Sequence, residues 1–262
     1  MTQIDCQFIL KPQFVLTVRK NEKEKPASIP QIIFEDSSIF IINKPAGWVV
    51  NEANTTRHLT VLQTWIRNNF DFETANSKEF RSGIVHRLDK ETSGILIIAK
   101  TTQAFGALQR EFKERRVKKI YTALVHGNAP EKGHIDAPVG RLPWRRDRFG
   151  VLPGGRAAET DYQTMRHYLS SDKSEYSLVE LMPKTGRTHQ IRIHMKHIGH
   201  SLVSDEFYAG RKTARNDRKW CERLFLHASK ITFMHPTSGE EVSFKAPLPP
   251  DLELSLSCLQ GN

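Results

Sequence analysis

Apolar and polar positions alternate with two different periods along the chain, and these periods predict where strands and helices lie. Two aliphatic runs separated by "EDSS" within residues 31–50 predict a β-hairpin that ends in the turn "NKPAG". Apolar residues at helical spacing in residues 60–70 and 101–116 predict two helices, the second with a threonine cap. Alternation returns in residues 117–127, which predicts a further strand.

The remainder of the chain continues this mixture. Residues 175–183 predict a strand, and residues 188–199 predict a helix with a cap at Thr188 and a glycine stop. Residues 223–236 and 241–247 predict a terminal pair of strands. Strands and helices are interspersed without the regular alternation of a parallel doubly wound sheet. This order favours an α+β fold with a mixed, mostly antiparallel β-sheet core and flanking helices.

A charged cluster interrupts the apolar pattern in residues 83–101, "GIVHRLDKETSGILIIAKT". The aliphatic flanks are typical of a strand that is buried on both faces. Charged residues at the end of such a strand lie where water and substrate can reach them. A surface turn in which Asp89 and Thr92 cap backbone groups explains the same cluster. The cluster alone does not decide between these interpretations.

Composition indicates a folded protein that binds a polyanion. The 262 residues contain 39 Lys and Arg against 29 Asp and Glu, a formal net charge of +10, which favours nucleic acid as the partner. No apolar run approaches the roughly 20 residues that span a bilayer, and no signal peptide is evident, so we expect a cytoplasmic protein without membrane contact. Three scattered cysteines argue against a disulfide framework and against a cysteine-based zinc site.

The domain organisation is expected to be simple. Residues 1–29 are predicted to form an N-terminal extension or linker, because a short apolar stretch is followed there by a charged segment with two prolines. Residues 30–262 carry all the other predicted elements and are expected to form one catalytic domain. We expect a monomer.

Three basic segments stand out: "REFKERRVKK", "GRLPWRRDRFGVLPGGR" and "GRKTARNDRKW". Basic runs are usually solvated surface. Trp144, Phe149 and Trp220 favour another use, because arginines in mobile loops neutralise phosphates while aromatic rings stack on unpaired bases. We therefore expect RNA as the partner, with a steeply salt-dependent affinity. The expected RNA contacts are Arg115, Arg116, Lys118, Arg145, Arg146, Arg148, Arg211 and Lys212.

Motifs of several enzyme classes are missing from the sequence. No pattern of nucleotide hydrolysis, dinucleotide redox, zinc-protease or serine-hydrolase chemistry appears. His189, His194, His197 and His200 recur near one helical face, but no carboxylate falls among them, so core packing or phosphate contact is the expected use. We expect neither a metal nor a cofactor.

Four segments, in chain order, resemble the RluA-type pseudouridine synthase family: "INKPAG", "VHRLDKETSGILIIAKT", "KKIYTALVHG" and "GRTHQIRIHMKHIGHSLVSDEFYAG". The HRLD block followed by TSG is highly specific, and its co-occurrence with the RTHQIR block makes chance implausible. The resemblance implies that uridine in RNA is converted to its C-glycoside isomer. The bond from N1 to the ribose breaks, the base turns within the pocket, and C5 forms the new bond.

The resemblance also implies the roles of three residues. Asp89 is the carboxylate that either attacks the nucleoside or removes a ribose proton, and the sequence does not choose between these routes. Arg192 matches the basic partner that keeps this carboxylate ionised, although its position about 100° from the apolar helix face also allows an exposed side chain. Tyr121 matches the tyrosine that packs on the target base and assists proton removal at C5, where an ordinary strand tyrosine would lie in the core.

Other positions are expected around the substrate. Arg87 matches the arginine that fills the space left by the flipped base, and flipping is required because the target atom is inaccessible in a stacked helix. Gly94 is expected to allow the sharp turn that aims the carboxylate. Leu226 is expected in the pocket floor, or in the plain core. The substrate-binding positions expected from the resemblance are Arg87, Leu226, His86 and Lys44. His86 is also expected to belong to the architecture of the loop, and Lys44 to brace the pocket.

The chain departs from the family at a few positions. Relatives often read HP at Asn51 and Glu52, and P and G at Ser201 and Ser204, which affects substrate choice and loop shape more than the chemistry. Too few residues precede the hairpin for the small RNA-binding domain that many relatives carry. Ribosomal RNA is the expected target and transfer RNA stays open. The alternative is an RNA-binding or RNA-remodelling protein of the same fold in which catalysis is secondary.

Overall fold

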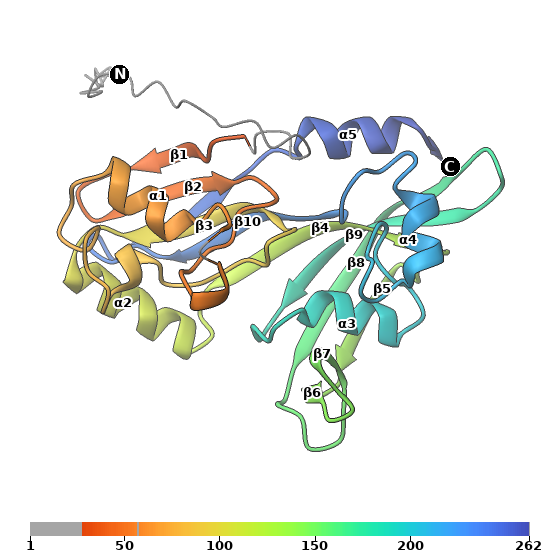
Figure 1. Ribbon diagram of the computed structural model, residues 1–262, viewed down its shortest axis with the longest axis horizontal. Coiled ribbons are helices and arrows are strands. Elements are labelled where there is room, and N and C mark those ends of the chain that lie inside the picture. Colours follow the sequence, from red (N-terminus) through yellow and green to blue (C-terminus); the bar gives the residue numbers. More distant parts are fainter. Residues whose placement is uncertain (1–27, 57, 262) are drawn as a thin grey trace.

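One ten-stranded sheet organises the chain in the computed structural model, which describes residues 28–56 and 58–261 (Figure 1). The main path runs through β1 (Gln31–Glu35), β2 (Ile39–Lys44), β3 (Ser93–Ala99), β10 (Leu226–Met234), β4 (Lys118–His126), β9 (Glu175–Pro183), β8 (Glu159–Leu169) and β12 (Gln260–Gly261). Outside this path, β11 (Glu241–Lys245) pairs with β10, and β5 (Lys132–Asp136) pairs with β8. Among these strand pairs only β3 with β10 is parallel, so the predicted α+β fold with a mostly antiparallel sheet is confirmed.

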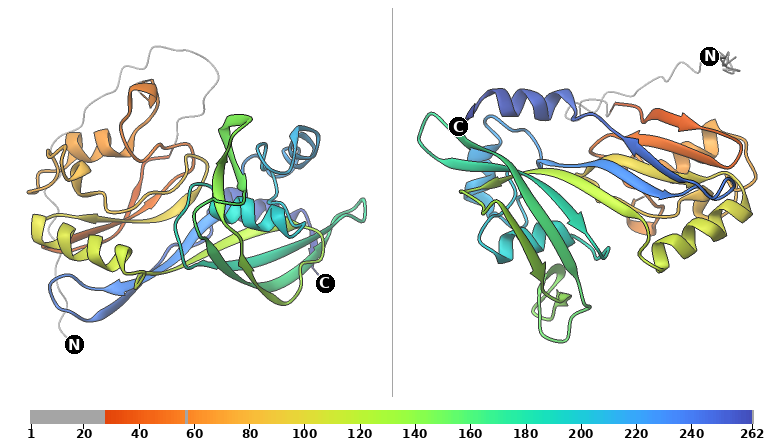
Figure 2. Two further views of the ribbon diagram at one scale, coloured as in Figure 1. Left: turned by 90° about the horizontal axis from the view of Figure 1, so that it is seen from below. Right: turned by 180° about the vertical axis from the view of Figure 1, so that it is seen from behind.

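The helices divide the molecule into two halves on this continuous sheet. They are α1 (Leu62–Asn69), α2 (Thr102–Lys113), α3 (Gln190–His197), α4 (Arg211–Asp217) and α5 (Pro250–Ser257). Figures 1 and 2 show α1 and α2 beside β1 to β3 in one half, and α3 and α4 beside β8 and β9 in the other, while β4 and β10 run through both. No helix within residues 28–56 and 58–261 is long and apolar enough to cross a membrane.

Strand β3 is buried on both faces, as its aliphatic run predicts. All seven of its residues are buried. Ile95 and Ile97 point to the layer that contains α2, and Leu96 and Ile98 point to the layer that contains α1. This alternation follows from the two-residue period of a strand that is covered by helices on each side.

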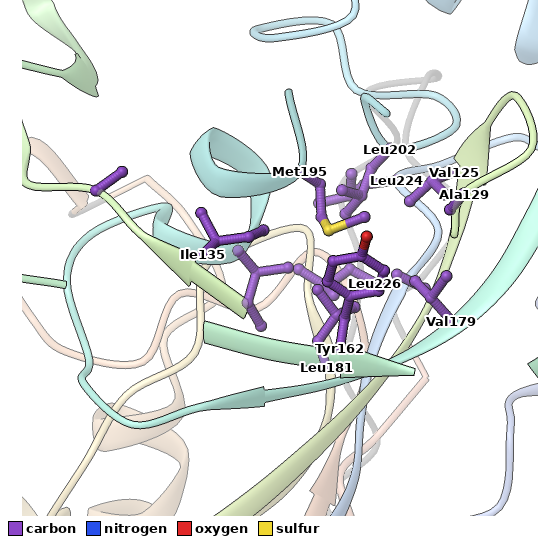
Figure 3. Packing of buried hydrophobic residues seen from close by; sticks show 13 residues of the cluster. Val125, Ala129, Ile135, Tyr162, Val179, Leu181, Met195, Leu202, Leu224 and Leu226 are labelled. Atoms are coloured by element: carbon purple, nitrogen blue, oxygen red, sulfur yellow. The ribbon is translucent and has the colours of Figure 1, made fainter. Parts of the chain in front are cut away.

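In the other half, α3 packs onto the sheet through its apolar side. Figure 3 shows Met195 close to Leu226, Tyr162 and Leu181, which the strands present to the helix. Ile191, one turn earlier on α3, belongs to the same cluster. Two contacts one turn apart fix the rotation of α3 about its axis, and this rotation decides where the polar residues between them point.

Several predicted elements are confirmed and others were missed. The hairpin of β1 and β2, helices α1 and α2, and strands β4, β9, β10 and β11 lie where the sequence predicts them. The cap of α2 is also confirmed, because the Thr101 hydroxyl accepts a hydrogen bond from the Ala104 N–H (3.1 Å). The basic segments expected to be loops are instead a hairpin of β6 (Val139–Leu142) and β7 (Arg145–Val151), and helix α4. Strands β5 and β8 were not predicted.

The predicted start of α3 is wrong by one residue. Thr188 does not cap the helix; the N-cap position is taken by His189, whose φ of 55° lies in the left-handed region and whose side chain makes no cap hydrogen bond. The Gln190 side chain accepts the Arg187 N–H (3.0 Å), which fixes the segment that leads into the helix. The predicted stop is confirmed, since Gly199 follows the last turn with a φ of 91°.

Gly94 has a role other than the expected turn. It lies within β3 with a φ of 120°, and a Cβ atom at this position would lie 2.3 Å from the carbonyl oxygen of Ala228 in β10. Glycine is therefore required for the close approach of the two parallel strands.

The described strands belong to this sheet or to the separate two-stranded sheet of β6 and β7, whereas the predicted extension lies almost entirely outside the described residues. The division of the chain at residue 30 stays a prediction.

Candidate active site

A cavity of about 560 Å³ lies where the two halves face each other. Its wall is formed by the loop before β3, by the end of α2 with the beginning of β4, and by the segment that leads into α3. Tyr121 of β4 and Leu226 of β10 complete it. The charged cluster before β3 therefore faces a cavity, which favours its interpretation as a site over that of a surface turn.

Backbone hydrogen bonds hold the loop that carries Asp89. The Thr92 N–H donates to the Asp89 carbonyl (3.2 Å), and the Gly47 N–H donates to the Lys90 carbonyl (2.8 Å). The Lys44 ammonium donates to three backbone carbonyls, one of them that of Lys90 (3.4 Å). The Asp89 side chain lines the cavity and keeps 20% of its surface exposed. A rigid loop thus presents a carboxylate that a ligand can reach.

Arg192 is the buried cation of this site. Its side chain is 2% exposed, and its Nε and Nη2 atoms donate to the two carboxylate oxygens of Asp205 at 2.7 and 2.8 Å. The third nitrogen, Nη1, lies 4.0 Å from Asp89 Oδ2 and 3.8 Å from Glu91 Oε2, and it has no hydrogen bond to any described residue. The structure therefore brings Arg192 next to Asp89, and the alternative of an exposed helix residue is wrong.

Asp205 is a site residue that the sequence interpretation missed. It is 1% exposed, and besides Arg192 it accepts hydrogen bonds from the N–H groups of Phe207 (3.0 Å) and Tyr208 (3.1 Å). Burial opposes the charge of Arg192, but the hydrogen bonds and the charge of Asp205 raise the pKa of the guanidinium. The available signal was an acidic residue in the block "SDEFYAG", close to a buried arginine that needs a partner.

His189 was expected in the core or at a phosphate, and it lies beside Asp89. Its Nε2 atom is 3.9 Å from Asp89 Oδ2, while Nδ1 and the Tyr208 hydroxyl are 2.9 Å apart. Burial lowers the pKa of His189, although the charge of Asp89 partly offsets this. Neither His189 nor Arg192 is close enough to form a hydrogen bond with Asp89. Both carboxylate oxygens are thus free of hydrogen bonds from the described residues.

Tyr121 and Leu226 lie side by side on two paired strands of the cavity wall. Leu226 is 3% exposed and belongs both to the wall and to the core cluster of Figure 3, so the two expectations for this residue are both met. Burial, together with the charge of Asp89, raises the pKa of Tyr121. Its hydroxyl therefore carries its proton in the free protein.

The other residues that were expected to contact the substrate differ in whether they line the cavity. Arg87 is exposed on the cavity wall. His86 also lines the wall, but its Nε2 atom accepts the Ile97 N–H (3.0 Å) and its ring stacks on Phe112 with 4.7 Å between centroids. Lys44 is fully buried and is not part of the wall, so the expectation that it contacts substrate is wrong; it braces the loop from behind.

Polar atoms without partners are concentrated at this cavity. Asn51 Oδ1, Thr92 Oγ1 and Arg192 Nη1 are buried, belong to wall residues, and have no hydrogen bond among the described residues. Buried polar groups are normally paired. Their convergence here indicates a site for a ligand with polar edges, and Asn51 is one of the positions where the chain departs from its family.

The expected RNA contacts differ in how accessible their charges are. Arg116 is paired with Glu111 and Glu114, and Lys118 is paired with Glu241 (2.8 Å). Arg148 donates to the Phe207 carbonyl (2.7 Å), which ties the β6–β7 hairpin to the loop that carries Asp205. The side chain of Arg146 lies outside the description. Exposed side chains are also found at Arg115 on the cavity wall, at Arg145 on β7, and at Arg211 and Lys212 on α4.

The three aromatic residues of the basic segments also differ. Trp144 is 73% exposed at the turn of the β6–β7 hairpin. Phe149 is half-buried beneath the Arg141 guanidinium (5.0 Å). Trp220 packs edge-on against Tyr176 with 5.3 Å between centroids. Only Trp144, among these three, has a ring free to stack on a base.

Two members of the predicted histidine group, His194 and His200, have structural partners. His194 is fully buried between the Thr160 hydroxyl (2.9 Å) and the Ala137 carbonyl (3.0 Å). His200 lies against the His126 carbonyl (2.9 Å). In the described ranges no group of histidine, cysteine and carboxylate side chains is arranged to hold a metal ion.

Comparison with known proteins gives consistent matches. The family described as RNA pseudouridylate synthase matches residues 38–197. A protein named "Uncharacterized RNA pseudouridine synthase" from Chloroflexus aurantiacus is 44% identical over 218 residues, which cover 83% of this chain and 66% of that protein. "Ribosomal large subunit pseudouridine synthase D" from Neisseria meningitidis serogroup B is 38% identical over 260 residues, 95% of this chain and 67% of that protein. The chain thus spans about two thirds of the length of these relatives.

A solved structure agrees with these matches. Human RNA Pseudouridylate Synthase Domain Containing 1 superposes with a TM-score of 0.69 and 28% identity, covering 91% of this chain and 92% of that one. The family expected from the four motifs is therefore confirmed over most of the described chain. The chain belongs to the RNA pseudouridine synthase family of the RluA type, whose members are isomerases that act on uridine in RNA.

Proposed function

We propose that this protein isomerises uridine to pseudouridine in large-subunit ribosomal RNA, with Asp89 as the catalytic carboxylate. The observation that carries the proposal is the presentation of Asp89 by a braced loop at a cavity between the two halves, with a buried Arg192 beside it. The choice of ribosomal RNA rests on relatives that carry the name of a ribosomal large subunit synthase. A cytoplasmic location and a monomeric state stay predictions.

The reaction needs few groups. The N1–C1′ bond breaks, C1′ joins C5, the C5 proton leaves to solvent and N1 gains a proton. Asp89 acts on the ribose, either as a nucleophile or as a base, and its free oxygens suit both routes. Arg192 keeps the carboxylate ionised and oriented. Tyr121 and Leu226 provide the apolar surfaces on which the base turns, and Arg87 fills the space that the flipped base leaves in the RNA.

Release of tritium from RNA labelled at uridine C5 tests this proposal, because C5 loses its hydrogen only when the new bond forms. Ribosomal and transfer RNA from a strain without the gene are purified separately and incubated with wild-type protein, with Asp89→Asn and with Asp71→Asn. Asp71 is an exposed aspartate and serves as the matched control. We expect release from ribosomal RNA by the wild type and by Asp71→Asn, and none by Asp89→Asn.

RNA binding is measured on the same samples. We expect Asp89→Asn to bind RNA at least as well as the wild type, since it removes a negative charge from the cavity. Release from transfer RNA alone contradicts the choice of substrate. Bound RNA without any release contradicts the catalytic proposal, and the RNA-binding alternative then takes its place.

A further inference from the structure

The charge of the cavity wall exceeds what the proposed chemistry uses. Asp89 is the one carboxylate among the wall residues, whereas the wall cations are Arg81, Arg87, Lys113, Arg115, Lys119, Lys184, Arg187 and Arg192. Two of these cations are neutralised by carboxylates outside the wall: Arg192 by Asp205, and Lys184 by Asp161 (2.7 Å). The remaining excess indicates that the cavity accepts an anionic group in addition to a base and a ribose.

Lys119 is the least expected of these cations. It is the second residue of β4, it is partly buried, and it lines the cavity, while its neighbour Lys118 points to the opposite side of the strand and pairs with Glu241. The Lys119 ammonium has no hydrogen bond or ion pair with any residue in the described ranges. Burial lowers the pKa of Lys119 to about 8, and no carboxylate offsets this effect.

The surroundings of Lys119 give it no internal anion. The nearby His86 is neutral, because burial and the charge of Lys119 lower its pKa to about 3, and its Nε2 atom already accepts the Ile97 N–H. The basic side chains beside Asp89 are His189 and Arg192, and Lys119 forms no ion pair with Asp89. A partly buried cation without a partner is unfavourable unless a ligand supplies the opposite charge.

Two arginines face each other across the same cavity. Arg115 follows α2 and Arg187 precedes α3, so they come from different halves of the molecule. Burial lowers the pKa of Arg187, and the charges of Arg156 and Arg115 lower it further. The Arg187 Nε atom donates to the Ala157 carbonyl (3.1 Å), which orients the guanidinium. An anion in the cavity would relieve the repulsion between these like charges.

We propose that Lys119, Arg115 and Arg187 form a phosphate subsite of the cavity, which binds the phosphodiester next to the uridine that reaches Asp89. This inference rests on the proposed function for the identity of the ligand as RNA. A phosphodiester has oxygens that the arginines bind in pairs and that lysine binds as a point charge. Contacts with one phosphate from both sides of the cavity fix where the RNA backbone lies. The subsite therefore determines which nucleotide of the RNA reaches Asp89.

The test uses Lys132 as the control for Lys119, because Lys132 is an exposed lysine on β5 that does not line the cavity. Binding of a dye-labelled decauridylate is measured by fluorescence anisotropy between 50 and 200 mM salt, for the wild type, Lys119→Met and Lys132→Met. We expect Lys119→Met to bind roughly tenfold more weakly at low salt and to lower the slope of log K against log salt by about 0.7, the value for one lost phosphate contact on a single strand. Lys132→Met should keep the wild-type slope, and Lys119→Arg should restore binding.

Two results overturn the subsite. One is wild-type affinity and slope in a folded Lys119→Met protein, and the other is an equal loss in Lys132→Met, which indicates only unspecific attraction. Circular dichroism checks folding, and Lys119→Gln replaces the methionine variant where that variant does not fold. Tritium release by the wild type separates the two proposals. If the wild type releases tritium and Lys119→Met has no effect on RNA binding, only the subsite is refuted. If Lys119→Met weakens RNA binding but no protein releases tritium, only the proposed reaction is refuted.

Discussion

At the scale of single residues, the site depends on how one guanidinium is shared among carboxylates. Two nitrogens of Arg192 are occupied by the buried Asp205, and this leaves only Nη1 toward Asp89 and Glu91. A bidentate contact fixes the plane of a guanidinium. Asp205 therefore determines where the free nitrogen points, although it does not face the cavity.

We expect Asp205→Asn to lower kcat for tritium release by about 100-fold, because a small displacement of a positioning group has effects of this size. The KM for RNA should change little, since the substitution is buried. The free energy of unfolding should fall by about 3 kcal/mol, because the variant leaves a buried charge without its partner. Steady-state kinetics and urea denaturation measure both effects.

Glu91→Gln is the comparison for stability. Glu91 is 44% exposed and lies 3.8 Å from the same arginine, so its loss should cost less than about 1 kcal/mol. A destabilised but fully active Asp205→Asn protein would contradict the positioning role.

The sequence allowed part of this site to be predicted. Asp89, Arg192, Tyr121 and Arg87 are found on or beside the cavity because short motifs carry them, and a motif contains both the residue and its local backbone. Asp205 and His189 were missed as partners because their role depends on distances across the fold, which no spacing in the sequence encodes. Lys44 was assigned to the substrate because its motif adjoins the pocket, but its side chain turns inward to backbone carbonyls.

At the scale of elements, β3 and β10 form the seam that holds the loop of Asp89 in place. Their parallel contact is short, with His227 opposite Ser93 and Ala228 opposite Gly94. The approach is so close that any Cβ atom on Gly94 meets the backbone of Ala228. The position of the loop before β3 therefore depends on the glycine at residue 94.

We expect Gly94→Ala to lower the free energy of unfolding by about 2–6 kcal/mol, as the sum of backbone strain at a φ of 120° and overpacking against β10. Gly106→Ala is the matched control, because Gly106 lies inside α2 and the nearest atom to its added Cβ is Arg110 Nη1 at 3.9 Å. This variant should gain about 0.5–1 kcal/mol. Urea denaturation of both variants measures these changes. Equal effects of the two substitutions would contradict the need for glycine where β3 approaches β10.

Elements were predicted best where one period dominates. Strand β3 and helix α2 have clear aliphatic patterns and lie where expected, whereas β6, β7 and α4 were taken for loops because arginine and turn residues dominate them. The hairpin of β6 and β7 is held by contacts with other elements, such as Arg148 with the Phe207 carbonyl. Tertiary contacts of this kind override local composition.

At the scale of the whole molecule, β4 and β10 join two halves that each have their own core, and the cavity lies between them. The family and the type of fold could be predicted from the sequence, because motifs and the order of elements are local properties. The presence of Arg115 and Arg187 at the same cavity could not be predicted from the sequence, because it depends on how the two halves are arranged on the shared sheet. Global stability should likewise depend on groups at the seam that joins the halves.

His227 is such a group, and it predicts how stability depends on pH. It is fully buried on β10, where Nδ1 contacts the Ser93 hydroxyl (2.9 Å) and Nε2 contacts the Ala246 carbonyl (3.3 Å). Nε2 donates to the Ala246 carbonyl, and the Ser93 hydroxyl can donate to Nδ1, so a neutral ring satisfies both contacts. Burial, partly offset by the Ala246 carbonyl, lowers its pKa to about 4.

The sign of the effect follows from linkage. Between pH 6.5 and pH 4 the unfolded chain binds a proton at His227 and the folded chain does not, so stability falls as the pH falls through this window. For this one group the loss between pH 7 and pH 4.5 should be about 2 kcal/mol. Urea denaturation at both pH values should show that His227→Gln loses less stability than the wild type by about this amount, since glutamine can accept and donate at the same positions without titrating. His197 is exposed, so His197→Gln is the control and should lose as much stability as the wild type between the two pH values. If His227→Gln also loses as much stability as the wild type, the His227 ring is not held neutral at the seam.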